Sequence, residues 1–424
     1  MLKTDDIRNA VAENWSSQIA WLSELVSFPS TRGEEAPCQD WLAREFRSRG
    51  WAVDRYTLDD VAIAHLPGYS PVHDTDYARA VQLVAALRAP VQRGRSLILQ
   101  GHVDVVPTGP AEMWSSPPFR PVIRDGRLYG RGSYDMKSGV CAMVFALDAL
   151  RRLGKAPGSD VYVQTVTEEE CTGNGALSTL ARGYRADACL IPEPTGQNIL
   201  RGTIGVMWFR LVVRGNPVHV HSAGSGANAI LSAYPILSAI QQEVARLNRT
   251  LGDDPWFSRI ENPIKFNVGR IRGGDWASSV PAWCAVDCRI GVPPGRDLAV
   301  FRADIAAVVE AAARRDPFLR DNWPEIVWNG FQAEDYVLPP GSAFEDTMRA
   351  AHRDVTGTEA EEIVLPAVTD CRFYGRYFSI PSLSYGVSGA NAHGYDEYVD
   401  LDTLKSVTCT LSVFISKWCD LEEI

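Results

Sequence analysis

Four side chains of types that bind metal ions each follow a short apolar stretch of this 424-residue chain: His102, Glu170, Glu193 and His393. A fifth candidate, Asp135, lies between the first two in the sequence. Such apolar stretches are typical of buried parallel strands, whose carboxyl ends meet at the edge of an open α/β sheet where ligands bind. Four strands would deliver ligands to one edge, and this convergence predicts a metal centre.

The elements that must position these side chains can be read from the same pattern. The expected strands cover residues 97–100, 161–167, 188–191 and 382–385. A helix is expected after Asp135, with Ser138 as its N-cap and a stop at residues 151–154. Two more helices are predicted within residues 5–50, on either side of a break at residues 29–33.

Asp104 stands two residues after His102. Because alternate residues of an extended chain share a face, Asp104 could accept a hydrogen bond from the second imidazole nitrogen and fix the tautomer. Taken alone, a His-x-Asp pair is more often structural than functional. Asp135 taken alone could equally be a helix-capping residue.

Glu168, Glu169 and Glu170 end an apolar strand. Adjacent carboxylates there raise one another's pKa unless cations neutralise them, and a solvated turn is the simpler alternative. With metal ions present, one glutamate can ligate while its neighbour acts as general base to a water, whose pKa a bound ion lowers from 15.7 to roughly 7.

Taken together, these segments resemble a family of dinuclear zinc deacylases. That family includes acetylornithine deacetylase, succinyl-diaminopimelate desuccinylase, aminoacylases and glutamate carboxypeptidases. The resemblance runs over nearly the whole chain in the right order, and the combination of motifs is highly specific. It rests on the segments at 102–107, 130–132, 135–139, 169–170, 193–195, 392–393 and 396–398.

The resemblance implies a role for each candidate ligand and for one glutamate. Asp135 would bridge two zinc ions, His102 and Glu193 would hold one of them, and Glu170 and His393 the other. Glu169 would be the general base. Glu168 stands where many members have Asp, and because oxygen and nitrogen ligands also suit cobalt or manganese, the metal is less certain than the site.

A histidine pair in the second half of the chain has a further implied role. In the family, a histidine nine or ten residues before an Asn-Ala-Ile segment reaches the other subunit's active site and stabilises the oxyanion. His219 lies nine residues before Asn228 and His221 seven, so the spacing favours His219 and leaves His221 a candidate. Without the family, a His-x-His pair on a strand is more often a surface or packing feature.

The resemblance also suggests substrate-binding residues. The segments around Ser279 and Arg289 look like the part of the family that meets the substrate carboxylate, with Arg289 as a bidentate partner and Asn228 nearby. Many relatives have Asn where Ser279 stands, which puts the role of that serine in doubt. Arg372 lies in a segment that resembles one near the substrate pocket.

The order of expected elements changes in the middle of the chain. Strand, helix, strand, strand, helix and strand are predicted at residues 206–213, 229–247, 264–271, 283–290, 298–313 and 325–331. This order is that of a split ferredoxin-like unit. We therefore expect a zinc-exopeptidase-like three-layer α/β/α catalytic domain at residues 1–203 and 333–424, with an α+β lid inserted at 204–332 that the family commonly uses for dimerisation.

Composition limits the kinds of partner. With 42 Lys and Arg against 52 Asp and Glu, the net charge is −10, which disfavours nucleic acid and anionic membranes as partners. The acidic start of the chain has no apolar region typical of a signal peptide, and we expect a cytoplasmic protein. Nine cysteines without a Cys-x-x-Cys pair do not describe a disulfide framework, and Cys284 with Cys288 is expected to be packing.

The function expected from these observations is that of a homodimeric, two-metal amidohydrolase. It would remove an N-acyl group from an amino acid or similar small carboxylate, and the specific expectation is acetylornithine deacetylase-like chemistry. One alternative keeps the metals but cleaves a dipeptide or a C-terminal peptide bond. Another is a binding protein that has kept the fold without catalysis. Residues 69–91 carry no motif that can be interpreted.

Overall fold

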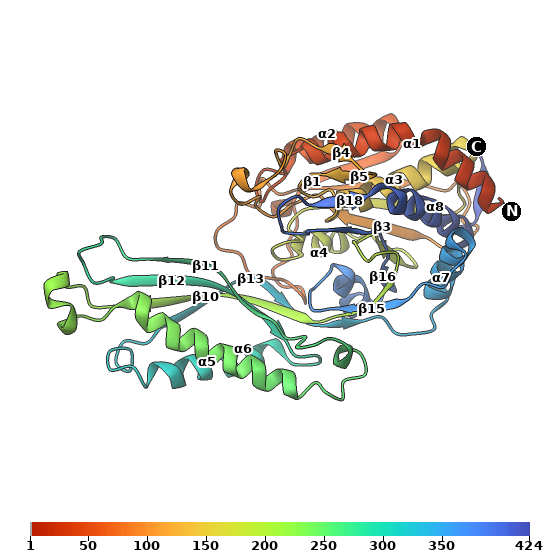
Figure 1. Cartoon of the computed structure of the whole chain (residues 1–424). Helices are drawn as coiled ribbons and strands as arrows, with labels where there is room; N and C mark the ends of the chain where they lie inside the picture. Colours follow the sequence, from red (N-terminus) through yellow and green to blue (C-terminus); the bar gives the residue numbers. More distant parts are fainter. Residues whose placement is uncertain (1) are drawn as a thin grey trace.

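A six-stranded sheet forms the centre of the larger unit in this computed structural model, which describes residues 2–424 (Figure 1). The strand order is β1-β2-β7-β3-β8-β16. Pairs β3-β7, β3-β8 and β8-β16 are parallel, and β1 and β2 add an antiparallel edge. The strands are β1 (Ala52–Thr57), β2 (Val81–Leu87), β3 (Leu97–His102), β7 (Val161–Val166), β8 (Cys189–Ile191) and β16 (Ser382–Ser384).

Helices cover both faces of this sheet. Gln39 of α2 accepts a hydrogen bond from the Thr165 side chain at 2.8 Å, whereas Thr179 of α4 donates one to the side chain of Gln164, the preceding residue of β7. Successive strand residues point to opposite faces, so α2 and α4 lie on opposite sides and the architecture is α/β/α. The helices are α1 (Thr4–Ser27), α2 (Ala36–Ser48), α3 (Lys137–Arg152), α4 (Asn174–Ala181), α7 (Ala343–Thr356) and α8 (Leu401–Trp418).

The inserted unit has its own sheet and its own core. Its order of elements is the predicted βαββαβ: β10 (Gly205–Arg214), α5 (Ala229–Arg249), β11 (Phe266–Gly273), β12 (Trp283–Val292), α6 (Leu298–Ala313) and β13 (Glu325–Ala333). All pairs are antiparallel, in the order β11-β12-β10-β13. The inserted unit extends away from the larger unit in Figure 1. The predicted fold class is confirmed.

Two hydrophobic cores support the proposed domain boundaries. One core is built from residues between Ile7 and Ile199 and between Tyr336 and Cys419. The second draws its buried residues from Ile204 to Leu319. We therefore keep residues 1–203 with 333–424, and 204–332, as the proposed division.

Small sheets complete the body. A three-stranded sheet, β14-β9-β15, lies where the two units meet, and a four-stranded sheet, β17-β18-β5-β4, lies beside the segment that carries Asp135. Their strands are β9 (Ile199–Thr203), β14 (Tyr336–Val337), β15 (Glu362–Leu365), β4 (Val122–Arg124), β5 (Arg127–Tyr129), β17 (Gly389–Ala390) and β18 (Tyr398–Asp400). Strands β6 (Lys155–Pro157) and β19 (Leu421–Glu423) pair near the carboxyl terminus.

Two local expectations are corrected. Ser138 does not cap α3: the cap position is Met136, and the Ser138 hydroxyl donates to the Tyr134 carbonyl instead. Part of residues 69–91 is the core strand β2, which the sequence reading missed because the polar loop before it carries no recognisable motif. Cys284 and Cys288 are buried on β12, as packing residues are.

Candidate metal centre

The parallel strands bring the predicted ligands to one edge of the central sheet. His102 is the last residue of β3, while Glu170 and Glu193 follow β7 and β8. Asp135 lies just before α3, and His393 comes from the loop between β17 and β18. Five side chains from distant parts of the sequence therefore lie in one small region.

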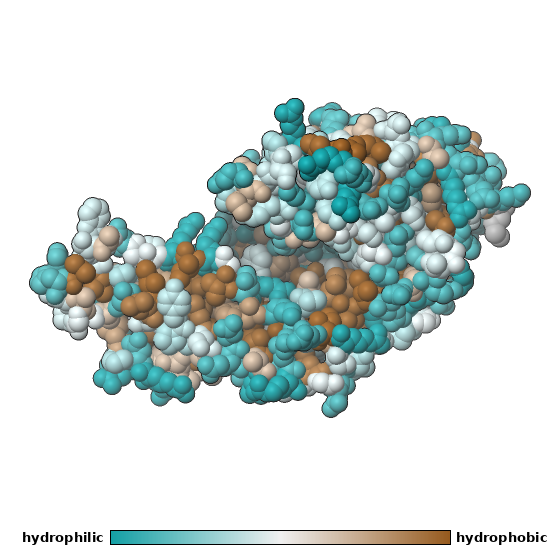
Figure 2. All heavy atoms as spheres, in the orientation of Figure 1, coloured by the Kyte–Doolittle hydropathy of each residue, from teal (hydrophilic) through white to brown (hydrophobic). Residues whose placement is uncertain are grey.

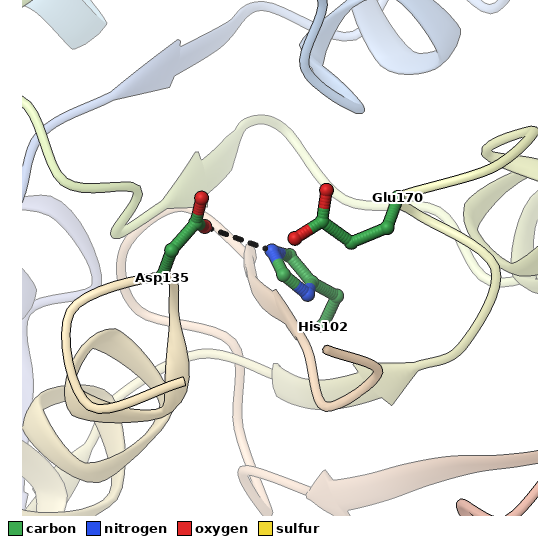
Figure 3. A group of neighbouring side chains, drawn as sticks. All are labelled: His102, Asp135 and Glu170. Atoms are coloured by element: carbon green, nitrogen blue, oxygen red, sulfur yellow. Dashed lines mark hydrogen bonds and ion pairs between the residues drawn. The ribbon is translucent and has the colours of Figure 1, made fainter. Parts of the chain in front are cut away.

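The Asp135 carboxylate lies between two imidazoles. Its Oδ1 is 3.3 Å from Nε2 of His102, and its Oδ2 is 3.6 Å from Nε2 of His393. Glu170 lies 3.1 Å from His393 Nε2, and Glu193 lies 4.0 Å from His102 Nε2. Figure 3 shows His102, Asp135 and Glu170, whose ligand atoms all lie within 4.8 Å of one another. Each oxygen of the Asp135 carboxylate thus lies next to one of the two histidines.

The charges of the cluster fit divalent cations. Burial, together with neighbouring carboxylates, raises the pKa of Glu169 and of Glu193 well above the usual range. Within residues 2–424, histidine is the only basic side chain in ion-pair contact with these two, Asp135 or Glu170. A set of carboxylate and imidazole donors that lacks Lys or Arg fits zinc, cobalt or manganese.

The histidines respond to the same excess of negative charge. Burial alone would lower the pKa of His102. The hydrogen bond to Asp135 and the negative charges of the nearby glutamates have a larger effect, and they raise this pKa well above its usual value. The hydrogen bond to Glu170 raises the pKa of His393 to about 9. Metal ions would take the place of these protons.

Asp104 orients His102 through its main-chain carbonyl and not, as expected from the sequence, through its carboxylate. His102 Nδ1 donates to the main-chain carbonyl of Asp104 at 2.9 Å, whereas the Asp104 carboxylate is 3.6 Å away. That carboxylate instead accepts the Glu170 main-chain N–H at 3.1 Å, and burial raises its pKa to about 7. With Nδ1 protonated, His102 presents the lone pair of Nε2 to the cluster.

Glu397 supports the segment that carries Asp135, although in the sequence it stood out only as part of a motif. Its buried carboxylate accepts the main-chain N–H groups of Gly132, Tyr134 and Asp135 at 2.9–3.0 Å, and it pairs with Arg131 at 2.6 Å. These contacts fix the segment that carries Asp135. No local sequence signal identifies this contact, because Arg131 and Glu397 lie 266 residues apart in the chain.

Glu168 does not face the cluster. Its carboxylate is paired with Arg32, whose Nη2 donates at 2.8 Å and whose Nε reaches the other oxygen. Tyr77 donates a further hydrogen bond at 3.1 Å. The guanidinium of Arg32 therefore neutralises Glu168 and relieves its repulsion with the two adjacent glutamates. Of the three glutamates, only Glu169 and Glu170 belong to the cluster.

Comparison with known proteins agrees with this geometry. A family model described as peptidase family M20/M25/M40 matches residues 98–417. The chain belongs to this family. It is therefore a metal-dependent hydrolase of the M20/M25/M40 peptidases, and the predicted resemblance is confirmed.

Relatives and one solved structure cover nearly the whole chain. The chain is 30% identical over 401 residues to succinyl-diaminopimelate desuccinylase of Delftia acidovorans (strain DSM 14801 / SPH-1), covering 91% of this chain and 94% of that one. It is 28% identical over 439 residues to N-formyl-4-amino-5-aminomethyl-2-methylpyrimidine deformylase of Halalkalibacterium halodurans, covering 97% of each. The fold matches the di-peptidase Dug1p from Saccharomyces cerevisiae with a TM-score of 0.80, 14% identity and 98% of each chain covered.

The predicted lid residues of this M20/M25/M40 chain lie together, away from the cluster. His219 is exposed, contacts His221 and forms an isolated bridge with Ser279. Asn228 caps α5, accepting the N–H groups of Ile230 and Leu231. All of these residues follow the outer end of β10 or lie beside it. Because β10 has ten residues, its two ends are roughly 30 Å apart, which separates these residues from the cluster. In one chain no hydrogen bond within residues 2–424 joins His219 to the cluster.

The two predicted substrate-binding arginines are placed differently from each other. Arg289 of β12 is partly exposed at the junction and donates to the Pro366 carbonyl at 2.8 Å. Arg372 is fully buried, donates to the Thr172 carbonyl at 2.8 Å and packs over the Phe373 ring. A guanidinium enclosed in this way has no surface for a ligand, so we remove Arg372 from the substrate-binding set.

Among residues 2–424, none of the helices combines the length and apolar character that a bilayer span needs.

Proposed function

We propose that this protein is a two-metal amidohydrolase that removes an N-acyl group from an amino acid or similar small carboxylate. The observation that carries the proposal is the Asp135 carboxylate, which presents one oxygen to His102 and the other to His393. Glu169 lies beside this pair, 3.8 Å from His102 Nε2 and 7% exposed. A bridging ligand with a free glutamate alongside is the arrangement that metal-assisted amide hydrolysis needs.

The ligand assignment follows the family resemblance, and the contacts of His102 with Glu193 at 4.0 Å and of His393 with Glu170 at 3.1 Å are compatible with it. His102 and Glu193 would hold one ion, Glu170 and His393 the other, and Asp135 would bridge them. When bound, the ions supply Lewis acidity that acidifies a water and polarises the amide carbonyl. Zinc is the favoured metal, with cobalt or manganese as alternatives for the same donor atoms.

Glu169 is the proposed general base and acid. Burial raises the pKa of its carboxyl, so the carboxylate is a better proton acceptor near neutral pH than an exposed glutamate. In the proposed reaction it takes a proton from the attacking water and gives the proton to the leaving amine. Asp104 holds the tautomer of His102 through its main-chain carbonyl and does not itself move a proton.

The lid is proposed as the surface of a homodimer. Strand β11 is an edge strand with unpaired backbone groups, and it exposes Val268 and Ile271. Leu231 and Tyr234 on α5 and Trp276 are also exposed. Figure 2 shows hydrophobic residues gathered on the lid. Large exposed apolar side chains on one unit are typical of a protein interface.

Dimerisation would supply the missing oxyanion donor. His219 of the partner subunit is proposed to stabilise the developing negative charge, with the partner's His221 as the alternative. Arg289, Ser279 and Asn228 are proposed to meet the substrate carboxylate. Arg289 carries most of this proposal because its guanidinium is partly exposed at the junction and can form two parallel hydrogen bonds to a carboxylate.

The similar proteins favour acyl removal over peptide cleavage. Two whole-length relatives are named for removing succinyl and formyl groups. Acetylornithine deacetylase-like activity is our specific proposal within this class. The second candidate is a dipeptidase, because the fold also matches the di-peptidase Dug1p.

The experiment that tests the proposal compares two substrate panels. Metal-free protein is reconstituted with zinc or cobalt, and release of free amino acid is measured from acetyl, succinyl and formyl amino acids and from dipeptides that carry the same side chains. We expect metal-dependent release from the N-acyl panel. Cleavage of dipeptides alone would move the assignment to the dipeptidase candidate.

A further inference from the structure

The hydroxyl of Ser70 lies between the lid and the turn that carries the catalytic glutamates. Ser70 is fully buried. Its Oγ accepts a hydrogen bond from the Gln332 N–H of β13 at 3.0 Å and donates one to the Thr172 carbonyl at 3.2 Å. A single oxygen atom thus connects a lid strand to the segment that follows Glu170.

Two neighbours of Ser70 extend the connection on the lid side. The Pro71 carbonyl accepts the Gly330 N–H at 2.9 Å, and the His73 N–H donates to Asn329 Oδ1 at 3.0 Å. Gly330 also comes close to the turn itself, since a Cβ atom at this position would lie 3.3 Å from the Cys171 carbonyl oxygen. The segment 70–77 is therefore bonded along the end of β13.

On the other side, the same segment is bonded to the turn at residues 168–174. Asn174 exchanges hydrogen bonds with the Ser70 backbone, accepting its N–H at 3.1 Å and donating to its carbonyl at 2.8 Å. Asn174 also donates to the Tyr77 hydroxyl at 2.7 Å, and Tyr77 donates to Glu168 at 3.1 Å. Both ends of segment 70–77 thus hold the turn.

Glu168 is the residue around which the turn is built. It has a positive φ of 69°, and its carbonyl accepts the N–H groups of Thr172 and Gly173 at 2.9 and 2.6 Å. Its carboxylate is held by Arg32 and Tyr77. Because Glu169 and Glu170 follow directly, the direction of their side chains depends on how Glu168 is held.

We propose that segment 70–77 couples the position of the lid to the orientation of Glu169 and Glu170, with Ser70 and Tyr77 as positioning residues. Breaking a buried hydrogen bond leaves polar groups unpaired and is therefore unfavourable. A shift of β13 therefore carries segment 70–77 and the turn with it. The consequence for catalysis rests on the proposed function, whereas the mechanical connection does not.

The test uses Ser70→Ala and Tyr77→Phe, each of which removes only one hydroxyl. Ser178→Ala is the matched control, because Ser178 is also fully buried but bonds only within α4 and to Tyr56. Amide hydrogen exchange is followed in the turn at 168–174 of the metal-loaded protein. We expect exchange there to be about tenfold faster in both test variants and unchanged in the control.

A lid-side variant makes the test specific for coupling. The Asn329 side chain bonds His73 and Asp74, and no hydrogen bond joins it to the turn within residues 2–424. We expect Asn329→Ala to speed exchange at 168–174 as well, and to add little in combination with Ser70→Ala. Calorimetry should also show weaker metal binding in Ser70→Ala. In steady-state kinetics of the same variant, the relative decrease in kcat should be larger than the relative change in KM.

The outcomes separate this inference from the proposed function. Unchanged exchange in Ser70→Ala, Tyr77→Phe and Asn329→Ala, beside normal hydrolysis, would overturn the coupling and leave the function standing. Equal acceleration in Ser178→Ala would also overturn it, since general loosening would explain the result. Faster exchange only in the test variants, in a protein that hydrolyses no amide, would support the coupling and reject the function.

Discussion

The main-chain N–H of Asp135 donates a hydrogen bond of 3.0 Å to the carboxylate of Glu397. The same carboxylate pairs with the buried guanidinium of Arg131. Glu397 thus holds the main chain of the proposed bridging ligand, and its contact with Asp135 is not to the carboxylate. Residues that orient a metal ligand typically change metal affinity by about 10–100-fold when replaced.

We therefore expect Glu397→Gln to weaken metal binding by about tenfold or more, because the Asp135 segment loses its charged anchor. Titration calorimetry of metal-free protein measures this directly.

Arg131→Met alone should lower Tm, since it leaves a buried carboxylate unpaired. The double replacement Arg131→Met with Glu397→Met should lower Tm by less than the sum of the single changes. Additive losses would show that the pair does not act as a unit.

Glu169→Gln should keep both metal ions and lose most turnover. The amide cannot accept a proton from water, and general-base catalysis typically contributes about 10²–10⁴-fold in rate. Metal content by mass spectrometry and kcat on the preferred N-acyl substrate are the two measurements. A variant with near-normal kcat would remove Glu169 from its assigned role.

Mixed dimers test whether a lid histidine acts on the other subunit. Glu169→Gln and His219→Ala chains should each be nearly inactive, yet a mixture should recover roughly a quarter of wild-type activity, because one site of each heterodimer combines intact residues from both chains. The same mixing with His221→Ala decides between the two histidines. No recovery with either variant would argue against a contribution from the partner.

The buried Glu35 gives a prediction about pH and stability. Burial, with the nearby Asp104, raises the pKa of Glu35 to about 8, above its unfolded value of about 4.3. The unfolded chain therefore releases this proton first, and the stability linked to it is lost as pH rises from about 4 to 8. Glu35→Gln lacks this loss. Its Tm relative to wild type should therefore be higher at pH 8 than at pH 5. The corresponding change in the free energy of unfolding is on the order of a few kcal/mol. Equal Tm differences at both pH values would contradict the assignment.

The sequence predicted the elements whose pattern is local. Apolar runs ending at His102, Glu170 and Glu193 became parallel strands because buried strands must be apolar on both faces. The βαββαβ order of the lid followed from alternating periods of two and of about 3.6 residues.

Long-range polar contacts were not predictable in the same way. The partner of Glu168 is Arg32, separated from it by 136 residues, and nothing in the local pattern links them. Arg372 carries a charge that composition alone would place at the surface, yet main-chain carbonyls and an aromatic ring enclose it. Such pairings depend on which loops the fold brings together, and only the structure gives that information.

The most direct test of the proposed two-metal amide hydrolysis is the rate of amino acid release from the N-acyl panel as zinc is added stepwise to metal-free protein. We predict release that requires metal and rises until two equivalents per chain are bound, with His102 and His393 variants saturating at fewer. Two bound equivalents with no hydrolysis of any N-acyl amino acid would contradict the account.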